Sequence, residues 1–349
     1  MHRVVSRVKS LWYKITHWEF WPFAVLYFPI NFYYPWLAFK CRSLFFFTAA
    51  NPSIDFGGML GESKSAIFEL IPRKYLPDYQ LIAPGDDVTA KDFAKQIGYP
   101  LIAKPDIGER GRLVEKIINE QALEKYLVKC PVPFLMQKFI PHPLELGVFF
   151  VKNPHEREGR ITSIVEKDFL SVIGNGQDTI RQLLHNDPRA RLQINFSHQR
   201  FQDILEEIPG KSEKITVEGI GNHCRGTTFL NANSRISEQL NRTFNTIAGD
   251  IQDFHFGRFD LRCTSWSDLE QGKNIMILEL NGAGAEPGHI YQPGFSLWQG
   301  YQSIFWHLST LAKISKANHE QGVPYWTFAQ GWKKMKMIRA YNRIIESAL

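Results

Sequence analysis

A strand-like alternation of polar and apolar residues stands out in the stretch His255–Cys263. It places Arg258, Asp260 and Arg262 on one face of a strand and the intervening apolar residues Phe259 and Leu261 on the other. After a polar loop, a short apolar run at 274–281 predicts a second strand. We expect the two strands to pair, which would bring their polar side chains together.

The second strand ends in two polar residues, Glu279 and Asn281, which are two positions apart and therefore share a face. If the strands pair, these two residues converge with Asp260 beside Arg258. Two carboxylates and an amide oxygen suit a hard divalent cation such as Mg²⁺, which shares its shell with phosphate oxygens. The alternative is a polar cluster that caps the following glycine-rich turn, and these residues alone leave both interpretations open.

The preceding part of the chain mixes helical and strand patterns. Helices are predicted at 62–71, 89–97 and 120–129, and strands at 79–83, 99–104, 133–140 and 146–151. Thr89 or Asp87 is expected to cap the second helix. Further on, 295–316 has the pattern of a long amphipathic helix.

One of these strands delivers a lysine to a glycine-bearing loop. Lys104 stands at the end of 99–104, and the loop 106–112 contains Gly108 and Gly111. Glycines allow backbone N–H groups to approach an anion closely. This arrangement suits phosphate binding, although the Gly-Lys-Ser/Thr order of a Walker loop is missing.

The stretch 20–39 contains no charged residue and is rich in aromatic residues. It is as long as a membrane span, but Pro22, Pro29 and Pro35 would interrupt a spanning helix. We expect either an element that lies in the cytoplasmic leaflet without crossing it, or an aromatic helical pair packed on the protein's own body or a partner subunit.

Charge and cysteine usage narrow the cellular setting. The net charge is +6, and basic residues without acids gather in 1–14 (Arg3, Arg7, Lys9 and Lys14) and in 332–343. Such ends favour an anionic membrane surface, and no pattern indicates nucleic-acid binding. The four cysteines show no pairing or metal-ligand spacing. We expect the protein to lie in the cytoplasm. The aromatic segment suggests, as an alternative, a peripheral position on the inner face of the membrane.

The order of these motifs resembles the ATP-grasp superfamily of carboxylate–amine ligases. The similarity extends over 62–292, and 172–183 and 221–231 are similar to stretches of cyanophycin synthetases and related amide ligases. D-alanine–D-alanine ligases share the same grasp core. The resemblance implies an α+β fold in which two α+β lobes clamp ATP. In this chain an atypical aromatic segment stands where the family has its pre-grasp domain.

The resemblance implies a role for each matching residue. Nucleotide contacts are expected from Lys64, Lys104, Gly108, Gly111, from the hinge Gln137, Lys138, Phe139 and Ile140, and from Glu145, which matches the acid that binds the ribose. Arg258 matches the arginine that faces the transferring phosphoryl group, and Lys167 is a further phosphate contact. Asp260, Glu279 and Asn281 match the ligands of Mg²⁺ or, in its place, Mn²⁺.

The implied activity is an ATP-dependent ligase that activates a carboxylate as an acyl phosphate and joins it to an amine. The loop after Asn281 differs from the family's and offers Glu286 and His289 as substrate-binding residues, or alternatively as ordinary turn residues. The substrates are expected to be small or lipid-linked, and a homodimer is left open. The rival functions are an ATP-grasp kinase and a non-catalytic nucleotide-binding scaffold at the membrane surface.

The same interpretation divides the chain into regions. We expect an aromatic N-terminal segment at 1–60, an ATP-grasp domain at 61–320 with lobes 61–140 and 141–320, and a basic C-terminal tail at 321–349.

Overall fold

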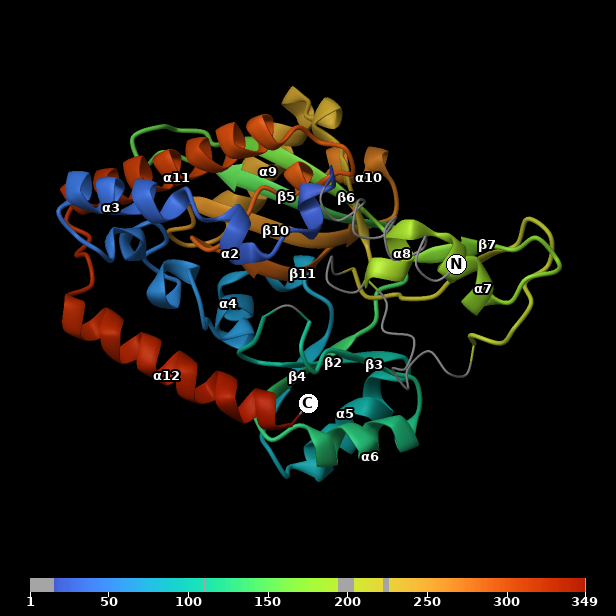
Figure 1. Ribbon diagram of the computed structural model, residues 1–349. Coiled ribbons are helices and arrows are strands. Elements are labelled where there is room, and N and C mark those ends of the chain that lie inside the picture. The colour runs from blue at the N-terminus through green and yellow to red at the C-terminus, as the bar shows by residue number, and fades with distance from the viewer. Residues whose placement is uncertain (1–15, 110, 194–203, 222–225, 349) are drawn as a thin grey trace.

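A four-stranded antiparallel sheet forms the small lobe of the protein (Figure 1). The computed structural model describes residues 16–109, 111–193, 204–221 and 226–348. In sheet order, the strands are β1 (Tyr79–Ile82), β4 (Phe134–Lys138), β2 (Leu101–Pro105) and β3 (Glu115–Ile117). Helices α5 (Asp87–Ile97) and α6 (Glu120–Lys129) pack their apolar faces on this sheet. The cap of α5 differs from the prediction: the side chain of Asp86 accepts from Thr89 N, so α5 begins earlier.

The large lobe is built on a five-stranded antiparallel sheet. In sheet order, its strands are β11 (Ile275–Asn281), β10 (Phe256–Cys263), β5 (Leu144–Val151), β6 (Arg160–Asp168) and β9 (Thr228–Asn231). Alternate residues of β5 face opposite sides, as the period of a strand requires. Val148 and Phe150 belong to one core, whereas Phe149 and Val151 belong to another. The predicted α+β fold of two lobes is confirmed.

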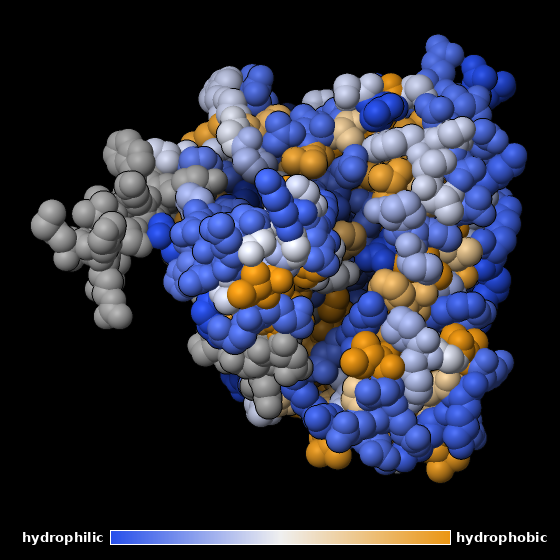
Figure 2. Space-filling model, turned by 90° about the vertical axis from the view of Figure 1, so that its right-hand side faces the viewer, coloured by the Kyte–Doolittle hydropathy of each residue, from blue (hydrophilic) through white to orange (hydrophobic). Residues whose placement is uncertain are grey.

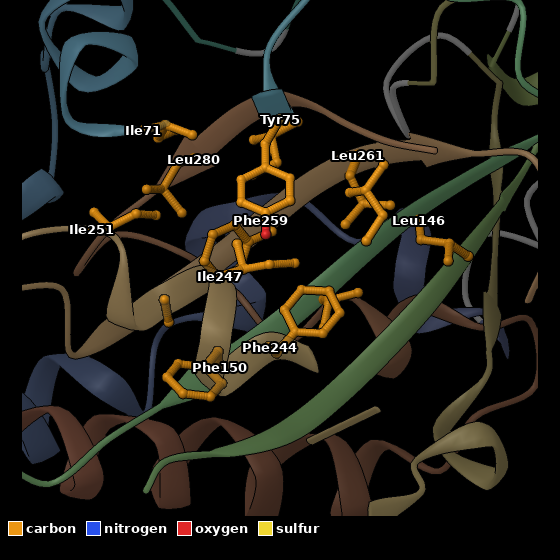
Figure 3. Close-up of a cluster of buried hydrophobic side chains, with 14 of the residues drawn as sticks. Ile71, Tyr75, Leu146, Phe150, Phe244, Ile247, Ile251, Phe259, Leu261 and Leu280 are labelled. Carbon is orange, nitrogen blue, oxygen red and sulfur yellow. The ribbon is translucent and has the colours of Figure 1, made fainter. Parts of the chain in front are cut away.

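The first of these cores lies between the sheet and three helices, α4 (Lys64–Leu70), α9 (Glu238–Gly249) and α10 (Trp266–Glu270). Phe244 of α9 meets Phe259 of β10 edge to face, with ring centres 5.5 Å apart (Figure 3). Both rings are fully buried, and burying each contributes about 1.5–3 kcal/mol. This packing fixes the position of β10 against α9.

The opposite face of the sheet is covered by α11 (Leu297–Glu320) and by the N-terminal segment. That segment contains α2 (Phe23–Leu26), α3 (Ile30–Cys41) and short 3₁₀ turns at Trp18–Phe20, Phe46–Ala49 and Asp55–Gly58. The inner side of α3 and the run Phe45–Phe47 are buried in this second core. Of the alternatives for the aromatic stretch, packing on the protein's own body is therefore realised on its inner side.

A buried amide ties this segment to the large-lobe sheet. Asn51 is fully buried, and its Nδ2 donates to the carbonyls of Gly57 and Phe256 at 3.1 and 2.8 Å. Its Oδ1 accepts from the backbone N–H groups of His255 and Phe256 at 2.9 and 3.0 Å. Four satisfied hydrogen bonds remove the desolvation penalty that a buried amide would otherwise carry.

The C-terminal residues form a long helix, α12 (Phe328–Ser347), which runs from the large lobe to the small one (Figure 1). Ile345 is buried in the core of the small lobe. At the other end of the helix, Lys334 donates to the carbonyl of Gly61 at 2.9 Å. The predicted basic tail is thus largely this helix.

A smaller unit extends from the large lobe beside the site. It contains β7 (Ser171–Ile173), β8 (Lys214–Thr216), α7 (Ile180–Asn186) and α8 (Pro188–Gln193) around its own apolar cluster. Glu19 of the N-terminal segment pairs with Arg189 of α8 at 3.3 Å. Within the described part of the chain, no helix is both long and apolar enough to cross a membrane.

Candidate active site

The three predicted metal ligands come together where β10 and β11 pair. Asp260 lies opposite Glu279, and Arg258 lies opposite Asn281. Asn281 Nδ2 donates to Asp260 Oδ2 at 2.9 Å. The convergence expected from the alternation therefore exists. No group of three His, Cys, Asp or Glu side chains with metal-site geometry occurs among the described residues, and the trio itself consists of two carboxylates and one amide.

Asp260 is held between two cations. Its Oδ1 lies 2.9 Å from Lys167 Nζ, and its Oδ2 lies 2.9 Å from Arg258 Nη2. Burial alone would raise the pKa of Asp260, but Arg258 and Lys167 outweigh burial and lower that pKa to about 2. Burial likewise works against the charge of Lys167, yet Asp260 and Glu145 raise its pKa. All three groups are therefore ionised at neutral pH.

Two lysines of the predicted nucleotide site reach the same hairpin from elsewhere. A bulge between the pairs Asp260–Glu279 and Leu261–Ile277 leaves Leu278 without a partner in the ladder. Lys104 Nζ of β2 donates to the carbonyl of Leu278 at 2.7 Å. A bulge redirects one residue out of a regular ladder, and here it offers a carbonyl to a lysine of the other lobe.

Burial opposes the positive charge of Lys104. Burial lowers the pKa of Lys104 to about 8, partly opposed by the nearby carboxylate of Glu279. Lys64 begins α4, donates to the carbonyl of Gly108 at 2.8 Å and lies 3.9 Å from Glu279 Oε1. Two buried lysines beside a metal-type hairpin suit an anionic ligand that supplies further negative charge.

The glycine loop is anchored at both ends. Asp106 Oδ1 accepts from Ser65 N at 2.8 Å, and Arg112 pairs with Glu346 of α12 at 3.0 Å. Gly111 adopts φ +69°, a left-handed conformation that favours glycine. The loop therefore lies beside Lys64, and its contact with phosphates stays a prediction.

The predicted adenine hinge already uses several of its backbone groups. Lys138 N donates to the carbonyl of Asp78 at 2.8 Å, and Phe139 N donates to the carbonyl of Pro100 at 3.3 Å. The carbonyl of Ile140 accepts from Arg262 Nη1 at 2.6 Å. Gln137 is buried within β4. Binding of adenine by this segment therefore stays a prediction.

Arg262 is a site residue that the motif comparison did not identify. Its Nε donates to Glu145 Oε2 at 2.7 Å, and its guanidinium lies 5.1 Å from the ring centres of both Phe139 and Phe169. Glu145 Oε1 also lies 3.2 Å from Lys167 Nζ. The Arg258–Asp260–Arg262 alternation was the available signal. Both oxygens of Glu145 thus have cationic partners. Its predicted contact with the ribose stays a prediction.

The loop after β11 reaches the site through Glu286. Arg258 Nη1 donates to the carbonyl of Glu286 at 3.1 Å, and Tyr291 Oη donates to Glu286 Oε2 at 2.7 Å. The hydroxyl of Tyr27 lies 3.2 Å from that of Tyr291. Burial raises the pKa of both phenols well above the ordinary value. Tyr27, which no sequence pattern singled out, therefore links the N-terminal segment to this loop.

His289 lies in a different environment. It is buried, its Nδ1 lies 2.7 Å from Ser163 Oγ, and its ring packs edge to face on Phe295. Burial lowers the pKa of His289 to about 4, so the imidazole is neutral at pH 7. These contacts suit a structural role, and its predicted contact with substrate is untested.

We expect the protein to lose stability below pH 6.5 through two buried histidines. Burial lowers the pKa of His289 and of His307 to about 4, whereas an unfolded histidine titrates near 6.5. The unfolded chain therefore binds protons first. The free energy of unfolding should be unaffected by these groups above pH 6.5 and should fall by up to about 1.4 kcal/mol per pH unit per histidine towards pH 4.

Urea unfolding between pH 7 and pH 4 measures this effect. The double variant His289→Gln/His307→Gln should show a shallower pH dependence than the wild type. His155→Gln, which alters an exposed histidine, serves as the control. An unchanged slope in the double variant would contradict the assignment.

The hairpin and the lysines lie where the two lobes meet. Figure 2, seen from the side of β7 and α7, shows a hollowed face that is hydrophilic over most of its area, with apolar residues at the edges of the hollow. The small lobe contributes Lys104, which binds the carbonyl of Leu278 in the hairpin. The large lobe contributes Lys167 and Arg258, which each lie 2.9 Å from Asp260. Such an arrangement concentrates positive charge around two carboxylates.

Comparison with known proteins gives the following similarities. No family model matches the chain. The large chain of carbamoyl phosphate synthase from Archaeoglobus fulgidus is 27% identical over 94 residues, which make up 26% of this chain and only 9% of that protein. Among solved structures, the D-alanine–D-alanine ligase of Bacillus anthracis is similar with a TM-score of 0.43 and 12% identity, covering 74% of this chain and 69% of that one.

A second ligase structure shows a similar level of likeness. The VanG D-Ala:D-Ser ligase of Enterococcus faecalis has a TM-score of 0.42 and 14% identity, covering 72% of this chain and 61% of the ligase. D-alanine–D-alanine ligases are among the proteins whose grasp core the order of sequence motifs resembles. The assignment of an activity therefore depends on the site itself.

Proposed function

We propose that this chain is an ATP-grasp ligase, which uses ATP and Mg²⁺ to activate a carboxylate as an acyl phosphate and then joins it to an amine. The observation that carries the proposal is the Asp260–Glu279–Asn281 cluster, surrounded by Lys64, Lys104, Lys167 and Arg258. Transfer of a phosphoryl group requires fixed positive charge around a highly anionic ligand. A purely structural role would not explain why four buried or half-buried cations gather at one lobe junction.

The donor set of this cluster fits Mg²⁺. Two carboxylates and one amide leave room for phosphate oxygens and water in an octahedral shell. Asn281 uses its Nδ2 to donate to Asp260, which leaves its amide oxygen for a cation. The side chain of Glu279 is 38% exposed and has Lys64 as its nearest cation. When bound, the metal would neutralise negative charge on the phosphates; Mn²⁺ has the same ligand preference.

Several residues of the chain have separate roles in the proposed reaction. In the first step, a carboxylate oxygen of the acid attacks the γ-phosphorus of ATP, and the bond to the β-phosphate oxygen breaks to release ADP. Lys104 and Lys64 hold the phosphates, and Arg258 offers its guanidinium to the transferring group. Asp260 and Glu286 hold that guanidinium in place through hydrogen bonds, so little reorganisation is needed during transfer.

In the second step, the amine nitrogen attacks the acyl carbon, loses a proton, and inorganic phosphate departs. Glu286 is the acid of this chain that borders the acceptor side, and Tyr291 orients one of its oxygens. Its other oxygen is suited to accept from an incoming amine. The hydroxyl of Tyr27, in the N-terminal segment, contacts that of Tyr291 and helps to position it.

The location and the substrate belong to the same proposal. We place the protein in the cytoplasm and at its membrane surface, and we propose a substrate that is amphiphilic. The support is the position of Tyr27, which connects the acceptor side of the site to the aromatic N-terminal segment. A kinase is the second candidate, because the same cluster would also transfer a phosphoryl group to a hydroxyl.

Two measurements test this function. Calorimetric titration with the non-hydrolysable analogue AMP-PNP should show binding that depends on Mg²⁺, and a wild-type protein that does not bind it would sink the proposal. Incubation with ATP, Mg²⁺, hydroxylamine and a panel of amino acids and fatty acids should then yield ADP, phosphate and a hydroxamate, because hydroxylamine traps an acyl phosphate. A kinase would instead yield ADP and a phosphorylated product without hydroxamate.

A further inference from the structure

The outer side of the N-terminal segment exposes a row of large aromatic side chains. Phe28, Phe32, Trp36 and Phe39 are 59%, 69%, 45% and 82% exposed. Their spacing along α3 and the residues before it places them on one side of the helix, while Leu37, Ala38 and Cys41 on the other side are buried. Contiguous exposed aromatic residues of this kind mark an interaction site rather than ordinary surface.

Helix α12 adds a second exposed aromatic pair at the same end of the molecule. Phe328 and Trp332 are 61% and 40% exposed, and their rings stack with centres 6.0 Å apart. Phe328 also lies 6.2 Å from the ring of Phe45, which follows the exposed Leu44. Figure 1 shows that the end of α3 and the start of α12 lie at one end of the protein. We refer to Phe28, Phe32, Trp36, Phe39, Leu44, Phe328 and Trp332 as the aromatic surface.

Basic groups accompany these rings. Lys40 Nζ lies 3.7 Å from the ring centre of Trp36, and Lys336 and Arg339 lie 6.0 and 5.7 Å from that of Trp332. Helix α3 contains no acidic residue, and α12 contains only Glu346, which pairs with Arg112. The aromatic surface is therefore positively charged as well as apolar. The face in Figure 2, at the opposite end of the molecule, is by contrast mainly hydrophilic.

We propose that the aromatic surface docks on an anionic lipid bilayer, with its rings in the head-group region and its basic side chains on the lipid phosphates. Aromatic rings and long basic side chains are the groups that favour this interface, because each has an apolar body and a polar or charged end. Each basic group near an anionic bilayer adds attraction. A second copy of the chain is a poorer occupant, because a two-fold contact would bring like-charged patches together.

Docking in this orientation connects the bilayer to the loop after β11 through Tyr27. Tyr27, whose hydroxyl contacts Tyr291, directly precedes Phe28 of the aromatic surface. This consequence rests on the proposed function, whereas the docking itself does not. The lipid test therefore omits nucleotide and substrate, so that its failure and failure of the ligase assignment remain distinguishable.

Flotation of the full chain with vesicles tests the docking. The wild type should float with phosphatidylcholine vesicles that contain phosphatidylserine and should remain behind with pure phosphatidylcholine. Phe32→Ser/Phe39→Ser should weaken the partition by roughly tenfold or more, because two interfacial rings are removed. Lys336→Glu/Arg339→Glu should weaken it on anionic vesicles to a similar degree, with a smaller dependence on salt.

The control is Val128→Ser, which removes an apolar side chain that is 92% exposed on α6 of the small lobe. It should float like the wild type, and circular dichroism should show that all variants are folded. The proposal is overturned if the wild type does not float with anionic vesicles, or if Phe32→Ser/Phe39→Ser floats unchanged. It is also overturned if sedimentation shows a wild-type dimer that this variant converts to monomer, which would assign the surface to a second copy.

Discussion

Replacing Asp260 by Asn should reduce kcat by roughly 100- to 1,000-fold, the order expected when one preorganised charge is removed from a transfer site. Asn keeps the shape of the side chain and an oxygen that can accept from Arg258. It removes the charge that holds Lys167 and Arg258 in position and that contributes to the metal site. ADP formation with the acid found in the hydroxylamine assay measures kcat, and AMP-PNP titration should show that Mg²⁺ no longer strengthens nucleotide binding.

The matched control for this variant is Asp250→Asn. Asp250 caps the C-terminal end of α9 in the same lobe and pairs with the exposed Lys74 at 3.3 Å. It should retain wild-type kcat and wild-type metal dependence. An Asp260→Asn protein with kcat within a few-fold of the wild type would remove the metal cluster from the proposed chemistry.

Replacing Arg262 by Met should lower the free energy of unfolding by about 3–5 kcal/mol, because it leaves one partner of a buried ion pair without its counter-charge. Glu145 is 5% exposed, and Lys167 would be its remaining cationic partner within the described part of the chain. The variant also loses the hydrogen bonds from Arg262 to the carbonyls of Ile140 and Gly219. Urea unfolding at neutral pH measures the loss.

Two further variants test the cause. The double variant Arg262→Met/Glu145→Leu removes both charges and should recover part of the lost stability, since no orphaned carboxylate remains. Arg242→Met, which alters an exposed arginine on α9, should leave the urea midpoint unchanged. A double variant less stable than Arg262→Met alone would show that packing, rather than the unpaired charge, accounts for the loss.

Much of the site was already implied by short-range patterns. The alternation in 255–263 assigned Arg258 and Asp260 to one face, and the strand ending in Glu279 and Asn281 made a paired polar cluster a direct expectation. The structure realises that pairing. Lys104 and the glycine loop were found for the same reason, because a strand and its following turn are local in sequence. The period of a strand determines which of its two faces a residue occupies, and it does so independently of the rest of the fold.

The contacts that position these residues join elements that are distant in sequence, so only the tertiary structure shows them. The bulge at Leu278 shows in no periodicity, yet it provides the carbonyl that Lys104 binds from the other lobe. The pairing of Arg262 with Glu145 joins residues more than a hundred positions apart. Tyr27 reaches Tyr291 only because the N-terminal segment folds across the large lobe. Such contacts depend on how separate elements dock, and docking is decided by the whole core rather than by any stretch within it.

The aromatic stretch 20–39 shows the same division. Its composition alone established that it seeks apolar surroundings and that its prolines interrupt a spanning helix. Which of its aromatic side chains are buried depends on how α3 packs on α11 and the large-lobe sheet. Because a helix can bury only one side against a flat surface, that packing left the opposite side, with Phe32 and Phe39, exposed to whatever lies outside the protein.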